Sequence, residues 1–189
     1  AEAGQTVPAA ASAVRTIPVT ALLSALWLFG ALAAALVQGG GYLLARRRLL
    51  RDARPDLEAE EQAGQTAAGL GLKRAVPVRR SGQVRTPMVL GLIRPVLLLP
   101  EGQAVDEVVL CHELTHLKRL DLAYKALLVA ACWLHWFNPL VWWMSRAASE
   151  NLELCCDDDV AAGRDAAFRR KYGELLLSTA EEKPGPTLS

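Results

Sequence analysis

Two of the three histidines in the 189-residue chain lie four residues apart, in a His-Glu-Leu-Thr-His motif that begins at His112. The surrounding run, 104–120, has the pattern of an amphipathic helix, on which His112 and His116 share one face. Two imidazoles supply half of a tetrahedral zinc shell, and Glu113 is placed to take the proton of the attacking water. The spacing predicts a zinc site. A helix that carries two histidines without a metal is the alternative, and a third ligand would decide between them.

Acidic residues recur on a helical period in the run 149–160, so that Glu150, Glu153 and Asp157 fall on one face. A metal-binding histidine usually donates its second N–H to a carboxylate. A glutamate with an aspartate one turn later can therefore provide both a ligand and such a partner, and we expect Glu153 as the third ligand and Asp157 behind a histidine. A solvated acidic face is the alternative. It is disfavoured because apolar neighbours predict a buried helix: Leu152, Leu154, Cys155, Cys156 and Val160.

The remaining metal-capable residues are interpreted as packing residues. Cys155 and Cys156 point about 100° apart on a helix, so they cannot both join one metal shell, and we expect small buried side chains. His135 lies on an apolar face beside Trp136 and is expected to be packed and hydrogen-bonded. No residue is assigned as the donor to the oxyanion. The candidates for that role are Tyr124, Arg146 and Tyr172.

The elements that must position these residues begin with an uncharged stretch, 16–45. About 20 apolar residues cross the hydrocarbon core of a bilayer, so this stretch predicts a transmembrane helix. A secretory signal peptide would have its positive charge before a shorter apolar core, whereas here an arginine cluster, 46–48, follows. The positive-inside rule makes the side after the helix cytoplasmic and leaves residues 1–15 outside as a loop or tail. A charged, solvated helix is predicted next, over 46–65.

An extended segment is predicted at 75–84, followed by two short apolar strands within 86–100. The three prolines of the second region cannot donate ladder hydrogen bonds, which limits these strands to the edges or ends of a sheet. An edge strand beside the metal helix can pair with an extended substrate as an added strand. We assign that role to Val89, Leu90, Gly91 and Leu92. Core packing is the alternative.

A second nearly uncharged stretch, 126–145, lies between the histidine motif and Glu153. One full membrane crossing here would place the two parts of the site on opposite sides of the bilayer. Asn138–Pro139 offers a break, because proline ends a helix and restricts the residue before it. We therefore predict a membrane-associated segment at 122–145, made of two half-length helices that enter the interface and return. Four tryptophans are expected at headgroup level: Trp133, Trp136, Trp142 and Trp143.

Taken in order, these motifs resemble the BlaR/MecR-type membrane zinc metallopeptidases, over roughly residues 20–178. The residues that carry the resemblance are Pro87, Gly91 and Pro95, the His112 motif with Arg119 and Asp121, His135-Trp136-Phe137-Asn138-Pro139, and Glu153 to Asp157. The resemblance implies a gluzincin site with one Zn²⁺ per chain. In it, His112, His116 and Glu153 are ligands, Glu113 is the general base and acid, and Asp157 supports a histidine.

The same resemblance implies a bacterial cell (inner) membrane protein whose active site faces the cytoplasm. The best-known members cleave a transcriptional repressor after an outer sensor domain binds a β-lactam. We find no Ser-x-x-Lys penicillin-binding nucleophile in these 189 residues, so the sensing step is not carried over. A protein substrate and the lipid bilayer are the expected partners. A net charge of +1 indicates no direct nucleic-acid partner, and a homo-oligomer stays open.

We therefore predict an α+β, mainly helical fold with one N-terminal transmembrane helix, a short strand pair, and a cytoplasmic zinc metallopeptidase domain over 46–189. The predicted function is a membrane-embedded zinc endopeptidase, the protease module of a signal-transducing receptor. A housekeeping membrane protease of the heat-shock or prenyl-protein-processing type is the first alternative, and the Trp-Phe-Asn-Pro element argues against it. A non-catalytic zinc-binding signalling or scaffold protein is the second, and the intact motif gives it no support.

Overall fold

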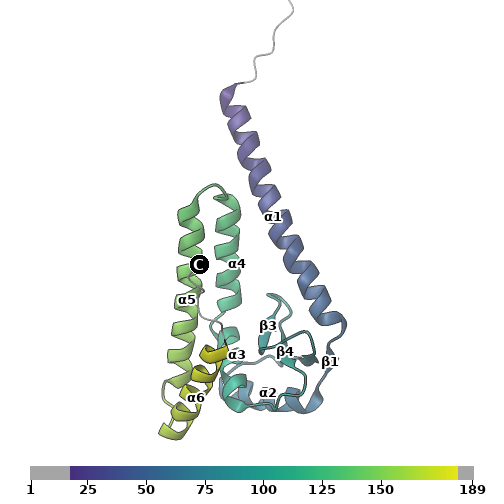
Figure 1. Ribbon diagram of the computed structural model, residues 1–189, viewed down its shortest axis with the longest axis vertical. Helices are drawn as coiled ribbons and strands as arrows, with labels where there is room; N and C mark the ends of the chain where they lie inside the picture. Colours follow the sequence, from purple (N-terminus) through teal and green to yellow (C-terminus); the bar gives the residue numbers. More distant parts are fainter. Residues whose placement is uncertain (1–17, 183–189) are drawn as a thin grey trace, which may run out of the picture.

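The computed structural model describes residues 18–182, and the tail predicted at 1–15 lies outside this range. A long first helix, α1 (Val19–Arg51), runs obliquely along the molecule (Figure 1). In the part of the chain that the structure describes, no residue of α1 is buried, and its length and composition suffice to cross a bilayer. The helix continues beyond its predicted end, where Arg48 and Arg51 interact favourably with the negative end of the helix dipole.

The charged segment after α1 differs from the single solvated helix predicted over 46–65. The chain leaves α1, forms the two-residue strand β1 (Arg54–Pro55) and begins a second helix, α2 (Leu57–Gly69). Asp56 causes the break, because its side chain accepts a hydrogen bond from the Ala59 N–H at 3.0 Å and so caps α2.

The strands form one four-stranded sheet in the order β1-β2-β4-β3. β2 (Val78–Ser81) runs parallel to β4 (Val96–Pro100), and β3 (Met88–Leu90) pairs with β4 in the antiparallel direction. The predicted strand pair is confirmed, and β3 lies at an edge of the sheet. Gly91 turns the chain after β3 with a φ of 98°, and a Cβ there would lie 2.5 Å from the Arg94 carbonyl oxygen.

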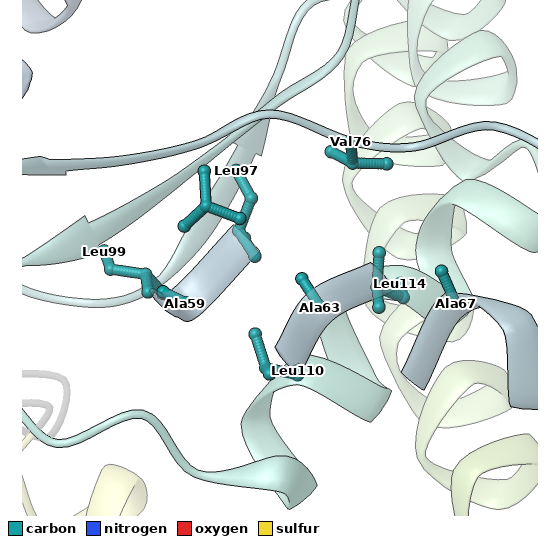
Figure 2. Close-up of a cluster of buried hydrophobic side chains, with 9 residues drawn as sticks. Ala59, Ala63, Ala67, Val76, Leu97, Leu99, Leu110 and Leu114 are labelled. Carbon is teal, nitrogen blue, oxygen red and sulfur yellow. The ribbon is translucent and has the colours of Figure 1, made fainter. Parts of the chain in front are cut away.

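The core holds the histidine-bearing helix, α3 (Glu107–Lys118), against α2 and the sheet (Figure 2). Leu110 and Leu114 lie on one face of α3 and are fully buried. Because the two leucines are four residues apart, that face is fixed and the histidines take the other. The other side chains of this cluster that Figure 2 labels come from α2, β4 and the loop before β2: Ala59, Ala63, Ala67, Leu97, Leu99 and Val76.

Two long helices form a hairpin beside α1, namely α4 (Asp121–Leu134) and α5 (Pro139–Ala161), and α6 (Ala166–Glu182) follows (Figure 1). The predicted break is confirmed, because Asn138 accepts a hydrogen bond from the Leu140 N–H at 3.0 Å and Pro139 begins α5. Near the tip, large apolar side chains are exposed: Leu127, Leu134, Phe137, Leu140, Trp142, Trp143 and Met144.

The tip of the hairpin is joined to α1 by two tryptophans. Trp27 Nε1 donates to the Leu134 carbonyl oxygen at 2.9 Å, and Trp136 Nε1 donates to the Trp27 carbonyl oxygen at 3.3 Å. Trp27 lies about 28 Å along α1 from Arg46, at 1.5 Å per residue. Trp136 therefore lies beside the apolar run of α1, far along the helix from the arginine cluster at its end. Whether residues 122–145 associate with a membrane stays a prediction.

Gly30 generates the first testable prediction, because a Cβ at this position would lie 2.1 Å from Cε2 of Trp136. Trp136 cannot yield freely, since it is hydrogen-bonded to Trp27 and packed edge-on against Phe137. Gly30→Ala should therefore destabilise the detergent-purified chain by about 1–3 kcal/mol, through overpacking. Thermal unfolding followed by circular dichroism measures this. Gly40→Ala is the matched control, because its added Cβ would meet no side chain or backbone of another described element within 4 Å. Equal midpoints for the two variants would contradict the prediction.

Candidate metal centre

Three side chains from two helices converge on one point. His112 and His116 of α3 bring their Nε2 atoms to within 3.2 Å of each other. Oε2 of Glu153, on α5, lies 3.3 Å from the His116 Nε2 and 4.0 Å from the His112 Nε2. The structure therefore brings together the three residues that the sequence predicts as ligands.

The far side of each imidazole faces a carboxylate. His116 Nδ1 lies 2.8 Å from Oδ2 of Asp121, and His112 Nδ1 lies 3.3 Å from Oδ1 of Asp157 and 2.8 Å from the Tyr172 hydroxyl. A carboxylate accepts, so both Nδ1 atoms carry protons and both Nε2 atoms point at the centre. The two Nε2 atoms and the carboxylate oxygen at such distances repel one another unless a proton or a metal cation lies between them. The donor set fits a divalent metal, and two imidazoles with one carboxylate are a known set for catalytic zinc.

Protons compete with a metal for these nitrogens. Burial lowers the pKa of His116, but its hydrogen bonds with Cys156, Glu153 and Asp121 outweigh burial and raise that pKa to about 11. Burial and the charge on His116 together lower the pKa of His112. The pair therefore holds one proton near the centre over a wide pH range, and metal affinity must fall as the pH falls.

Glu153 stays ionised at the centre. Its hydrogen bond with His116 lowers its pKa, against the effect of burial, and Lys125 lowers it further, to about 2. Oε1 of the same carboxylate lies 2.7 Å from the Lys125 Nζ. One oxygen of Glu153 therefore faces the imidazoles and the other faces an ammonium group.

Cys156 is buried, as predicted, but its sulfur also lies near the imidazoles. The ligand atoms of His112, His116 and Cys156 all lie within 4.8 Å of one another. Burial raises the pKa of the Cys156 thiol, whereas the thiolate is the form that binds metals, so Glu153 is the better donor. The prediction of burial is wrong for Leu154 and Cys155, which are exposed because they lie on the opposite face of α5.

Asp121 and Tyr172 have positions that the sequence did not predict. Asp121 is 2 % exposed and lies in the first turn of α4. Leu120, with a φ of 60°, reverses the chain between α3 and α4 and so returns Asp121 to His116. The signal in the sequence that could have indicated this contact is an aspartate only five residues after His116. The Tyr172 hydroxyl donates to Oδ1 of Asp157 at 2.5 Å, so Tyr172 lies behind His112 and is not placed as an oxyanion donor.

Glu113 lies between the metal centre and the edge of the sheet. Burial, with a contribution from the charge of Glu153, raises its pKa to about 7, and a hydrogen bond from the Val89 N–H partly offsets this. A carboxyl group with such a pKa can both accept and donate a proton near neutral pH. Of the four residues assigned to the substrate strand, Val89 is thus brought beside Glu113. Leu90 is half-buried, Gly91 is buried and Leu92 is exposed in the turn.

Two histidines of an HExxH helix with a glutamate from a later helix define a class of metallopeptidase sites. The family described as BlaR1 peptidase M56 matches residues 2–188, and the chain belongs to this family. Over 107 residues it is 38% identical to "Regulatory protein BlaR1" of Bacillus licheniformis, covering 54% of this chain and 18% of that protein. Over 111 residues it is 28% identical to "Methicillin resistance mecR1 protein" of Staphylococcus aureus and Staphylococcus epidermidis, covering 56% of this chain and 19% of those proteins. The matched region is therefore under a fifth of each relative.

The hydrogen bond between Asp121 and His116 generates the second prediction. Asp121→Asn should weaken metal binding about 10- to 100-fold, because the amide no longer strengthens His116 as a donor. Titration of the purified chain against a chromophoric zinc chelator measures the affinity. Asp158→Asn is the control, since Asp158 is exposed on α5 and its side chain lies outside the centre. An unchanged affinity for Asp121→Asn would contradict the assigned contact.

Proposed function

We propose that the chain is the zinc endopeptidase module of a membrane-anchored, signal-transducing receptor and hydrolyses a protein substrate on the cytoplasmic side. The observation that carries the proposal is the convergence of two imidazole nitrogens and one carboxylate oxygen, with a second carboxyl group of pKa about 7 on the same helix. Family membership supports peptidase activity and argues against the housekeeping alternative.

Each side chain at the centre has a separate role in this proposal. His112, His116 and Glu153 would hold one zinc ion, and Asp121 and Asp157 would keep the imidazoles in the ligating tautomer. When bound, zinc supplies Lewis-acid polarisation of the scissile carbonyl and a lower pKa for water. Glu113 takes the proton of the attacking water and delivers it to the leaving amine, a transfer that a pKa near neutrality favours in both directions.

The substrate is proposed to bind as an extended strand along β3. β3 is an edge strand, so one side of its backbone is available for pairing. The Val89 N–H lies close enough to Glu113 to affect the pKa of its carboxyl group, so a peptide paired along β3 would lie next to the proton-transfer group. Val89, Leu90, Gly91 and Leu92 are the proposed contacts.

The membrane arrangement is also a proposal. An apolar α1 that ends in arginines supports a bilayer anchor with residues 1–15 outside and the domain 46–189 in the cytoplasm of a bacterial cell. The exposed apolar side chains of the hairpin support membrane association of residues 122–145. The word "regulatory" in the name of one relative supports a signalling role, and a transcriptional repressor is the substrate that the family resemblance suggests.

Zinc content and proteolysis, measured in parallel, test the ligand and base roles. The wild-type chain should hold about one zinc and cleave casein. Glu153→Ala should lose the metal, because two imidazoles alone bind zinc weakly. Glu113→Gln should keep the metal and lose at least about 100-fold in kcat/KM, the usual contribution of a general base. Elemental analysis and a fluorescent casein assay measure the two quantities. Full zinc occupancy in Glu153→Ala would exclude this ligand set, and full activity in Glu113→Gln would exclude this base. Zinc without turnover in the wild type would favour the scaffold alternative.

The raised pKa of Glu113 generates a further prediction. Below a pH of about 7 its carboxyl group is protonated and cannot accept the proton of water. The value of kcat/KM should therefore fall about tenfold per pH unit on the acid side of this pKa. The profile is measured with zinc in excess, and zinc content is checked at each pH to separate this effect from metal loss. A flat profile down to pH values about two units lower would contradict the role of Glu113.

A further inference from the structure

The ammonium group of Lys125 lies at the site, although lysine is not one of the proposed zinc ligands. Lys125 extends from α4 to Glu153, where its Nζ lies 2.7 Å from Oε1. It lies four residues after Asp121, so both side chains project from the same face of α4. One helix therefore supports two different ligands from behind: Asp121 contacts His116, and Lys125 contacts Glu153.

The two contacts have opposite effects on the electron density of the proposed ligands. A carboxylate behind an imidazole adds electron density and makes it a stronger donor to a metal. An ammonium group on a carboxylate withdraws electron density and occupies one of its two oxygens.

We propose that Lys125 is a positioning residue that occupies Oε1 of Glu153, so that this ligand offers the metal one oxygen with reduced charge. A metal held by a weaker carboxylate donor keeps more of its own positive charge for the substrate carbonyl and for water. Lys125 thus lowers the affinity for zinc and raises the rate of hydrolysis. The inference rests on the proposed function, because it requires Glu153 to be a ligand.

Lys125→Met removes the charge while keeping the length of the side chain. The zinc dissociation constant of this variant should be unchanged or up to about 30-fold lower, because Glu153 then binds the metal with its full charge and both oxygens. Its kcat/KM should fall about 10- to 100-fold. The Co²⁺-substituted variant should show weaker visible absorption than wild type, as a rise in coordination number predicts. Lys125→Arg keeps a cation and should restore most of the activity.

The control is Lys118→Met, which removes an exposed lysine of α3 and should match wild type in all three measurements. Lys125→Gln serves as a second variant if circular dichroism shows that Lys125→Met is unfolded. Zinc affinity and activity that fall together would make Lys125 a merely structural support and overturn the proposal, as would unchanged activity. Glu153→Ala, measured in parallel, distinguishes a failure of the proposed ligand set from a failure of the proposed role of Lys125. If Glu153→Ala keeps zinc, both the ligand set and the role of Lys125 are excluded. If Glu153→Ala loses zinc while zinc affinity and kcat/KM do not change in opposite directions in Lys125→Met, only the role of Lys125 is excluded.

Discussion

The approach of two Nε2 lone pairs to 3.2 Å, with a carboxylate oxygen beside them, is the constraint on which the rest of the domain depends. Such a group of donors is repulsive until a cation neutralises it, so the fold must hold it from outside. Each neighbouring helix contributes at least one supporting group, since α4 contributes Asp121 and Lys125, α5 contributes Asp157 and α6 contributes Tyr172. The buried polar residues around the centre are thereby paired in a connected network.

Hydrophobic packing holds α3 from its opposite face. Leu110 and Leu114 are buried against the alanine face of α2 and the leucines of β4 (Figure 2). Alanines allow α2 to approach closely, because they add little volume between the helix axes. The site thus lies between an apolar core on one side and a polar network on the other, and β3 brings its free edge to Glu113.

Local patterns in the sequence predicted the parts of this arrangement that depend on one element. The spacing of His112 and His116, the helical period of Glu153 and Asp157, and the break at Pro139 all follow from helix geometry. The supporting contacts of Asp121, Lys125 and Tyr172 depend on how α3, α4 and α6 pack against one another. The periodicity within one helix does not predict that packing. The prediction over 46–65 was wrong for a related reason, since the charged residues there hid the every-fourth-residue alanines that α2 buries.

The hairpin links the long apolar helix α1 to the proposed metal centre through α4. At one end α4 carries Asp121 and Lys125, and at the other its last turn accepts the hydrogen bond of Trp27. A helix of 14 residues spans about 21 Å and is stiff over that length. Asp121 contacts His116 of α3 and Lys125 contacts Glu153 of α5, so the position of α4 fixes both contacts at once. The same helix therefore connects the contact with Trp27 of α1 to both contacts at the proposed metal centre.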